Sequence, residues 1–183
     1  MTKKDFVKKV TILIDSREKE NQHIKDALDQ LGIKHEVRKL DFADYSFMID
    51  GRDFSQTCVI ERKANVDEFY GNIMHDRERI EKELLAISRL AVQCTLIIEN
   101  CASYTKLKQT KVSARDMEKQ NRKVQNIGEH CYCTLLSWES ANRYGFKTAF
   151  IKDKTDTTGK ILETFYYYYH NYHDLVKSRR NYK

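Results

Sequence analysis

The stretch Ile60-Glu61-Arg62-Lys63 decides how this sequence is interpreted. It ends a β-rich run that begins at Thr57, so the run is expected to be a strand. Alternation along a strand places Glu61 and Lys63 on one face and Arg62 on the other. Burying an acid and a base together without a function would be costly. The stretch therefore predicts both a strand and a chemical site on one of its faces.

Asp44 lies one hairpin upstream of this stretch and supplies a second carboxylate. Two carboxylates can hold a hard cation such as Mg²⁺, which polarises a phosphate and activates a water molecule. The Lys63 ammonium would orient that water and offset charge growing on the phosphate. The residues predict metal-assisted phosphodiester hydrolysis. Two plainer interpretations stay open here: Asp44 as an exposed turn acid, and Glu61-Arg62-Lys63 as a solvated edge strand.

Hydrophobic patterning outward from this stretch predicts alternating strands and helices. Ile24, Leu28 and Leu31 recur at helical spacing before Gly32, and Asn65 followed by Glu68 resembles a capping box. Strands are expected over 10–15, 35–40, 45–49, 57–62, 95–99 and 147–152, and helices over 20–31, 65–91, 129–144 and 157–176. This order predicts an α/β fold, a mixed central β-sheet flanked by α-helices.

The connections are less regular than the elements. Asp50-Gly51 indicates a hairpin, with a loop longer than two residues because residues 52–56 are polar. Residues 101–128 are expected to form a loop and then a helix, and residues 177–183 a frayed basic tail. The length of 183 residues predicts a single domain over 1–183, with a core over about 10–152 and a C-terminal helix and tail over 157–183.

Charge is unevenly distributed along the chain. The net charge is +6, yet residues 1–100 hold 17 Lys and Arg against 19 Asp and Glu, whereas residues 101–183 hold 16 against 8. This asymmetry indicates an acidic site in the first part and either a polyanion-facing or simply a solvated basic surface in the second. The cations expected to contact phosphate groups of such a polyanion are Lys106, Lys108, Lys111 and Arg115. The four tyrosines at 166–169 either stack on bases or pack inward.

Cysteine usage and hydropathy limit the compartment. Five cysteines without small-scaffold spacing fit a reducing, intracellular location, cytoplasmic or, in a eukaryote, nuclear. No apolar run approaches the roughly 18 residues of a membrane span, and the basic N-terminus lacks the apolar region of a signal peptide. We therefore expect no membrane partner.

A larger set of residues gives the chain a specific resemblance. Ile14-Asp15-Ser16-Arg17-Glu18 ends the first strand, Asp44-Tyr45 opens the hairpin, Glu61-Arg62-Lys63 with Asp67 closes it, and Ile97-Ile98-Glu99 ends a later strand. In this order and spacing, the chain resembles the nuclease domain of XPF-type structure-specific endonucleases, in the PD-(D/E)XK, restriction-endonuclease-like superfamily. The resemblance covers residues 10–100 closely and residues 129–176 in outline.

This resemblance implies a DNA endonuclease that uses Mg²⁺ or Mn²⁺ and cuts near branches, flaps or single/double-strand junctions, leaving 5′-phosphate and 3′-hydroxyl ends in repair, recombination or replication. It implies that Asp44, Glu61 and the backbone carbonyl of Arg62 ligate the metal, with Asp15 as a further acid, and that Lys63 serves the water. Supporting contacts would come from the remaining motif residues, Arg17, Arg62 and Asp67. Arg77 on the long helix would contact the site or DNA.

The chain departs from the family pattern at three points. Ala43 replaces the glycine before the hairpin aspartate, which costs of order 1 kcal/mol if that position needs a positive φ. Glu81 replaces a glutamine and is expected to pair with Arg77. No tandem helix-hairpin-helix module is recognisable, so a stand-alone nuclease domain is expected, as a homodimer or with a nuclease-fold partner. The alternative function is a non-catalytic nucleic-acid-binding subunit paired with another protein.

Overall fold

A computed structural model of the chain describes residues 1–90, 92–119 and 124–181. They form two compact units, one built from residues 1–60 together with the chain from residue 155 onward, the other from residues 61–154. The boundary falls inside strand β5 (Cys58–Lys63), directly after Ile60. Each unit is described separately below, and the expectation of one domain over 1–183 stays a prediction.

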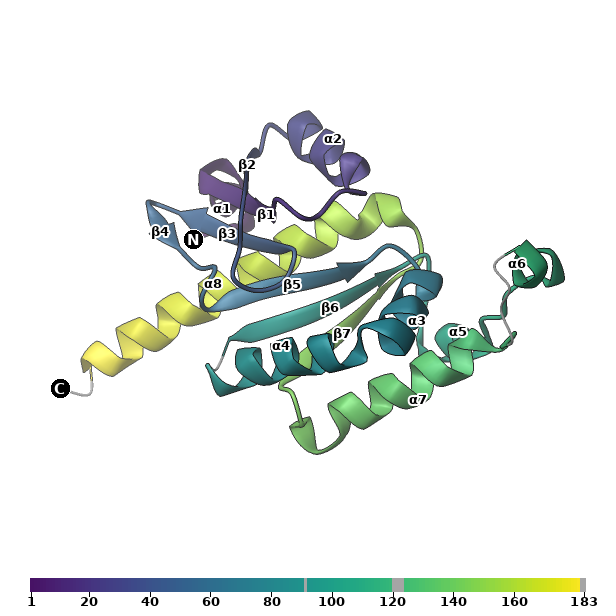
Figure 1. The fold of residues 1–183 in the computed structure, drawn as a ribbon. Coiled ribbons are helices and arrows are strands. Elements are labelled where there is room, and N and C mark those ends of the chain that lie inside the picture. The colour runs from purple at the N-terminus through teal and green to yellow at the C-terminus, as the bar shows by residue number, and fades with distance from the viewer. Residues whose placement is uncertain (91, 120–123, 182–183) are drawn as a thin grey trace. The chain divides into compact units, whose positions relative to one another are not determined.

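The first unit is a mixed sheet accompanied by helices (Figure 1). Strand β1 pairs in parallel with β2 and antiparallel with β3, and β3 pairs antiparallel with both β4 and β5. Helix α8 contacts both α1 and α2. The elements are α1 (Lys3–Lys9), β1 (Val10–Asp15), α2 (Gln22–Gln30), β2 (Lys34–Arg38), β3 (Tyr45–Ile49), β4 (Arg52–Asp53) and α8 (Thr157–Asn181).

Aromatic side chains fill the core of the first unit. Phe47 on β3 stacks on Phe54 with ring centroids 4.4 Å apart, and Phe165 of α8 lies 4.8 Å from Phe47. Tyr168 and Tyr169 add edge contacts to Phe54, whereas Tyr167 is exposed. The tyrosine run therefore packs partly inward, because consecutive residues of a helix point in different directions.

The second unit combines the end of β5 with β6 and β7, which pair in parallel. Helices α3 and α4 contact β6, and α7 packs on α3 and α5 (Figure 1). Its elements are α3 (Val66–His75), α4 (Arg77–Arg89), β6 (Gln93–Glu99), α5 (Tyr104–Gln109), α6 (Ala114–Lys119), α7 (Ile127–Glu139), a 3₁₀ turn at Ser140–Asn142 and β7 (Phe146–Ile151); a further 3₁₀ turn, Lys154–Asp156, crosses to the first unit. The predicted fold class, α/β with a mixed sheet flanked by helices, is confirmed.

Several expected boundaries are wrong. The helix expected over 65–91 is two helices, because Asp76 leaves helical geometry at φ −119° while capping the end of one and the start of the other. The apolar positions on either side, Ile73 and Ile80, are seven residues apart, so the helical period continues across the break and hides it. Ala91, the last residue of that expected face, lies outside the described residues.

The hairpin and the C-terminus also differ from expectation. Asp50 and Gly51 both have positive φ and form a tight two-residue turn into the short strand β4, which pairs Arg52 with Ile49. Polar residues after position 51 therefore extend the hairpin before the chain loops to β5. The tail expected to fray continues α8 to Asn181. Helix α1 was not expected at all.

Candidate active site

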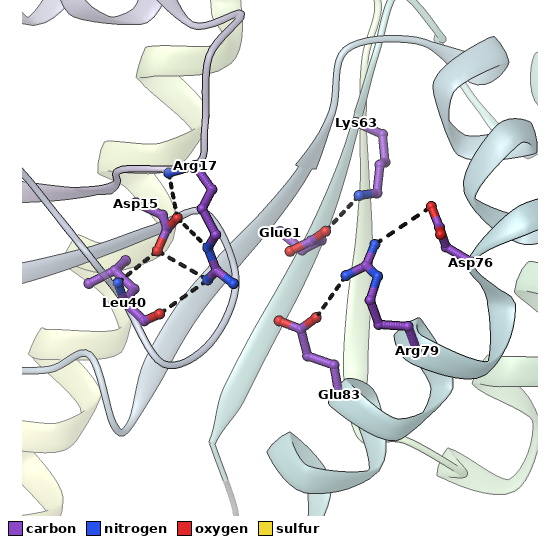
Figure 2. Close-up of polar contacts among 8 residues, drawn as sticks. All are labelled: Asp15, Arg17, Leu40, Glu61, Lys63, Asp76, Arg79 and Glu83. Carbon is purple, nitrogen blue, oxygen red and sulfur yellow. Dashed lines mark hydrogen bonds and ion pairs between the residues drawn. The ribbon is translucent and has the colours of Figure 1, made fainter.

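Asp15 ends β1 in the first unit and is a buried carboxylate held by four hydrogen bonds. Its Oδ1 accepts from the backbone N–H and Nε of Arg17, both at 2.7 Å, and its Oδ2 accepts from Nη2 of Arg17 and, at 2.7 Å, from the backbone N–H of Leu40. Burial alone would raise the pKa of Asp15, but the hydrogen bonds from Arg17 and Leu40 lower it overall. Figure 2 shows this cluster, which ties the end of β1 to the segment that leads to Asp44.

Asp44 is fixed by its backbone in the same unit. Its carbonyl accepts from the Asp15 N–H at 2.8 Å, and its own N–H donates to the carbonyl of Ile60 at 3.0 Å. Ala43, directly before it, has φ 55°, the left-handed conformation that glycine adopts at little cost. Asp44 is half-buried, and the strained backbone of Ala43 lies directly before it. The Ile60 carbonyl that accepts from the Asp44 N–H belongs to β5, the strand that continues into Glu61.

The second unit contains the predicted acid–base pair. The Lys63 Nζ lies 2.6 Å from Glu61 Oε1, with the two side chains 9% and 24% exposed. The neighbouring Arg62 points to the other face and pairs with Glu99 Oε2 at 2.7 Å, with side chains only 3% and 1% exposed. The alternation expected of the strand is confirmed. Glu99, which ends the later strand of the motif set, is the buried counter-ion of Arg62.

Arg79 and Glu83 are not among the predicted site residues, yet Figure 2 shows both pointing toward Glu61 and Lys63. Arg79 forms two ion pairs: its Nη1 lies 3.7 Å from Glu83 Oε2, and its Nη2 lies 3.8 Å from Asp76 Oδ2. Arg77, the expected helix arginine, instead donates from Nε to Glu81 at 2.9 Å, as the Glu81 substitution suggested. Each arginine has a glutamate four residues later, so spacing alone could not distinguish them; two positions on a helix differ by roughly 200°.

Asp67 lies in the first turn of α3, where a carboxylate also interacts favourably with the helix dipole. It lines a cavity of about 450 Å³ in the second unit. Other residues lining this cavity include Asn65, Asn100, Lys111 and Asp116. Asp67 was expected to support the site and Lys111 to contact phosphate, and both line this one cavity.

The remaining basic residues lie on and after α5. Lys106 is exposed, whereas Lys108 lies 3.5 Å from Glu129 and 5.2 Å from the ring centroid of Tyr132. The side chain of Arg115 lies outside the described residues, as do Arg122 and Lys123. A DNA-binding role for this segment stays a prediction.

The carboxylate oxygens among the predicted site residues are the kind of ligand that a hard divalent cation prefers. Among the residues that the structure describes, no group of three or more His, Cys, Asp or Glu side chains gathers as a metal cluster. Mg²⁺ needs fewer, because it is commonly bound through one or two carboxylates together with water and substrate phosphates. Within the described part of the chain, Glu61 contacts Lys63 through Oε1, which leaves its Oε2 available. Each unit thus supplies one carboxylate of a suitable kind, Asp44 in the first and Glu61 in the second.

Burial leaves four of the five thiols unsuited to reaction. Cys58, Cys94, Cys101 and Cys131 are buried, and burial raises the pKa of Cys131 to about 12. No helix in the described ranges combines the length and apolar character needed to cross a membrane.

Comparison with known proteins identifies the family of the chain and supports its fold. The family model described as the ERCC4 domain matches residues 14–163. Among solved structures, XPF from Aeropyrum pernix is 17% identical, with a TM-score of 0.56 over 84% of this chain and 64% of that chain. The same protein in complex with DNA is 17% identical, with a TM-score of 0.55 over 85% of this chain and 62% of that one. The chain therefore spans less than two thirds of these structures, and at this identity they support the fold. No curated protein sequence matches the chain.

Proposed function

The chain belongs to the ERCC4 domain family, and on that premise we propose that it is a metal-dependent endonuclease acting on branched, flap or junction DNA. The observation that carries this proposal is the Glu61–Lys63 pair on β5, in which Lys63 is buried and Glu61 is partly exposed, with the backbone N–H of Asp44 bonded to the carbonyl of Ile60, the residue directly before Glu61. The DNA in one of the similar XPF structures agrees with the substrate class. A homodimer or a nuclease-fold partner stays a prediction.

Asp44 and Glu61 are the proposed ligands of Mg²⁺ or Mn²⁺, with the Arg62 carbonyl completing the set. When bound, the metal would supply Lewis-acid polarisation of the phosphate and a more acidic water. The Lys63 ammonium, held 2.6 Å from Glu61, orients the attacking water and offsets charge on the phosphate. The Arg62–Glu99 pair fixes the backbone between Glu61 and Lys63 from the opposite face.

Asp15 and Arg17 act as supports in this proposal. All four hydrogen bonds of the Asp15 carboxylate are used to hold Arg17 and Leu40, so Asp15 positions the segment before Asp44. A direct metal contact by Asp15 would have to displace one of these donors. We therefore assign Asp15 a positioning role.

The test is cleavage of a labelled DNA panel comprising single-strand, duplex, flap, fork and four-way junction substrates. Wild type, Asp44→Asn and Glu61→Gln are compared in Mg²⁺, in Mn²⁺ and in chelator. We expect metal-dependent cutting of a branched substrate that each substitution lowers by about 100-fold or more, the scale of losing a transition-state contact. Wild-type binding without cutting under every condition would contradict the proposal and favour a binding subunit.

A further inference from the structure

Glu81 lies at the centre of a second charged cluster in the residue 61–154 unit, separate from the Glu61–Lys63 pair. Its Oε1 accepts from the Arg77 Nε at 2.9 Å and from the Trp138 Nε1 at 2.8 Å, and its Oε2 lies 3.8 Å from Nη2 of Arg143. Burial would raise the pKa of Glu81, but the Trp138 and Arg77 hydrogen bonds lower it overall, so the carboxylate stays charged. One anion thus holds two cations from different elements.

Both arginines are held in place while remaining accessible. The Arg77 and Arg143 side chains are 48% and 50% exposed. The guanidinium carbon of Arg143 lies 4.8 Å from the ring centroid of Tyr144, a buried ring that meets Trp138 edge to face. Each guanidinium carries five N–H donors, and the contacts of the described residues use only a few of them. Because about half of each side chain is exposed, the remaining donors can bind a group from outside the protein.

The backbone leading to Arg143 is strained. Ala141 and Asn142 have φ 52° and 54°, and Gly145 has φ 66°. A left-handed alanine costs of order 1 kcal/mol, and such strain persists where the surrounding structure enforces it, often at functional sites. Two successive left-handed residues aim the chain so that Arg143 reaches the Glu81 carboxylate.

We propose that Arg77 and Arg143, held by Glu81, form a clamp for one phosphodiester group of the DNA backbone. The charges match: two guanidiniums and one carboxylate leave a net charge of +1, which one phosphodiester neutralises. Guanidinium forks suit the paired oxygens of a phosphate, and holding them in advance reduces the ordering cost of binding. The proposal rests on the proposed function, since it assigns a grip on the substrate of that site.

The test measures binding of fluorescent flap DNA by anisotropy in chelator, where no cleavage occurs, across a salt series. Arg77→Gln and Arg143→Gln are each expected to weaken binding by about ten-fold, the order of one charge-assisted contact. Each should also lower the slope of log affinity against log salt by about 0.9. Lys82→Gln is the matched control, because Lys82 lies on the same helix and pairs with Glu78.

The Glu81→Gln variant distinguishes a phosphate-binding clamp from a cluster that only stabilises the fold. The glutamine Oε1 can still accept from both Trp138 and Arg77, so Arg77 stays held while the negative charge is lost. We expect tighter DNA binding and a steeper salt slope, with melting temperature followed as a check on folding. Arginine variants that bind like Lys82→Gln, while wild type still binds and cuts DNA, would overturn the clamp alone. A wild type that neither binds nor cuts would overturn the proposed function as well.

Discussion

Glu61 and Arg62 are neighbours in β5, yet the two faces of the strand use charge in opposite ways. Arg62 and Glu99 are almost fully enclosed, whereas the Glu61 and Lys63 side chains keep 24% and 9% exposure. A buried pair is costly to break and can reach nothing outside the protein. A partly open pair can exchange its partner for a metal or a phosphate. Burial, more than residue type, distinguishes the structural pair from the chemical one.

Breaking the enclosed pair should give the largest effect. Arg62→Met removes the cation that lies 2.7 Å from the buried Glu99 carboxylate, and we expect the free energy of unfolding to fall by about 3–5 kcal/mol. Urea denaturation measures this loss. The double variant Arg62→Met/Glu99→Leu should recover most of it, because it removes both charges of the buried pair. A loss below about 1 kcal/mol in the single variant would mean that this face is open to water.

Breaking the open pair should separate activity from stability. Glu61→Gln is expected to lower cleavage by about 100-fold or more, while unfolding shifts by only about 1 kcal/mol because the amide still accepts from Lys63. Parallel kinetics and denaturation on one preparation measure both quantities. Asp67→Asn provides the comparison: its carboxylate lines the neighbouring cavity, so we expect a smaller loss of activity. Equal losses for both variants would place Asp67 in the catalytic group.

The Asp15 carboxylate extends the comparison to pH. Folding lowers its pKa, so its contribution to stability is complete above its ordinary value of 3.8 and is lost as pH falls through the lower folded-state value. Asp15→Asn should cost about 2 kcal/mol at neutral pH, the order of a hydrogen-bonded charged group. Its stability should also change less than that of wild type between pH 5 and 2, as followed by thermal melts. Parallel curves for the two proteins would contradict this assignment.

The smallest effect concerns the backbone before Asp44. Ala43→Gly relieves a left-handed alanine, so we expect a gain of up to about 1 kcal/mol in stability and unchanged cleavage. Gly32→Ala is the mirror control: its φ is 65° and an added Cβ would meet nothing within 4 Å, so any loss reports backbone strain alone. Destabilisation by Ala43→Gly would mean that the methyl group contributes more through packing than it costs.

The sequence predicted the alternating elements and the two-faced strand well, because neighbouring residues of β5 point to opposite faces and the apolar residues of α2 follow the helical period. It missed the break at Asp76, because the apolar spacing between Ile73 and Ile80 is compatible with a continuous helix. It favoured Arg77 over Arg79. The spacing could not correct this choice, because each arginine precedes a glutamate by four residues. Only three-dimensional placement reveals that Arg79 points toward Glu61, whereas Arg77 pairs with Glu81, the acceptor of the Trp138 hydrogen bond.

The aromatic core of the first unit has a consequence for synthesis of the chain. Phe47 and Phe54 leave the ribosome early, but Phe165, Tyr168 and Tyr169 are added more than a hundred residues later. The segment 61–154, a compact unit in its own right, is translated in between. The apolar surface of the first unit therefore stays uncovered until α8 has been synthesised. During this interval the nascent chain is most prone to aggregation and to chaperone binding.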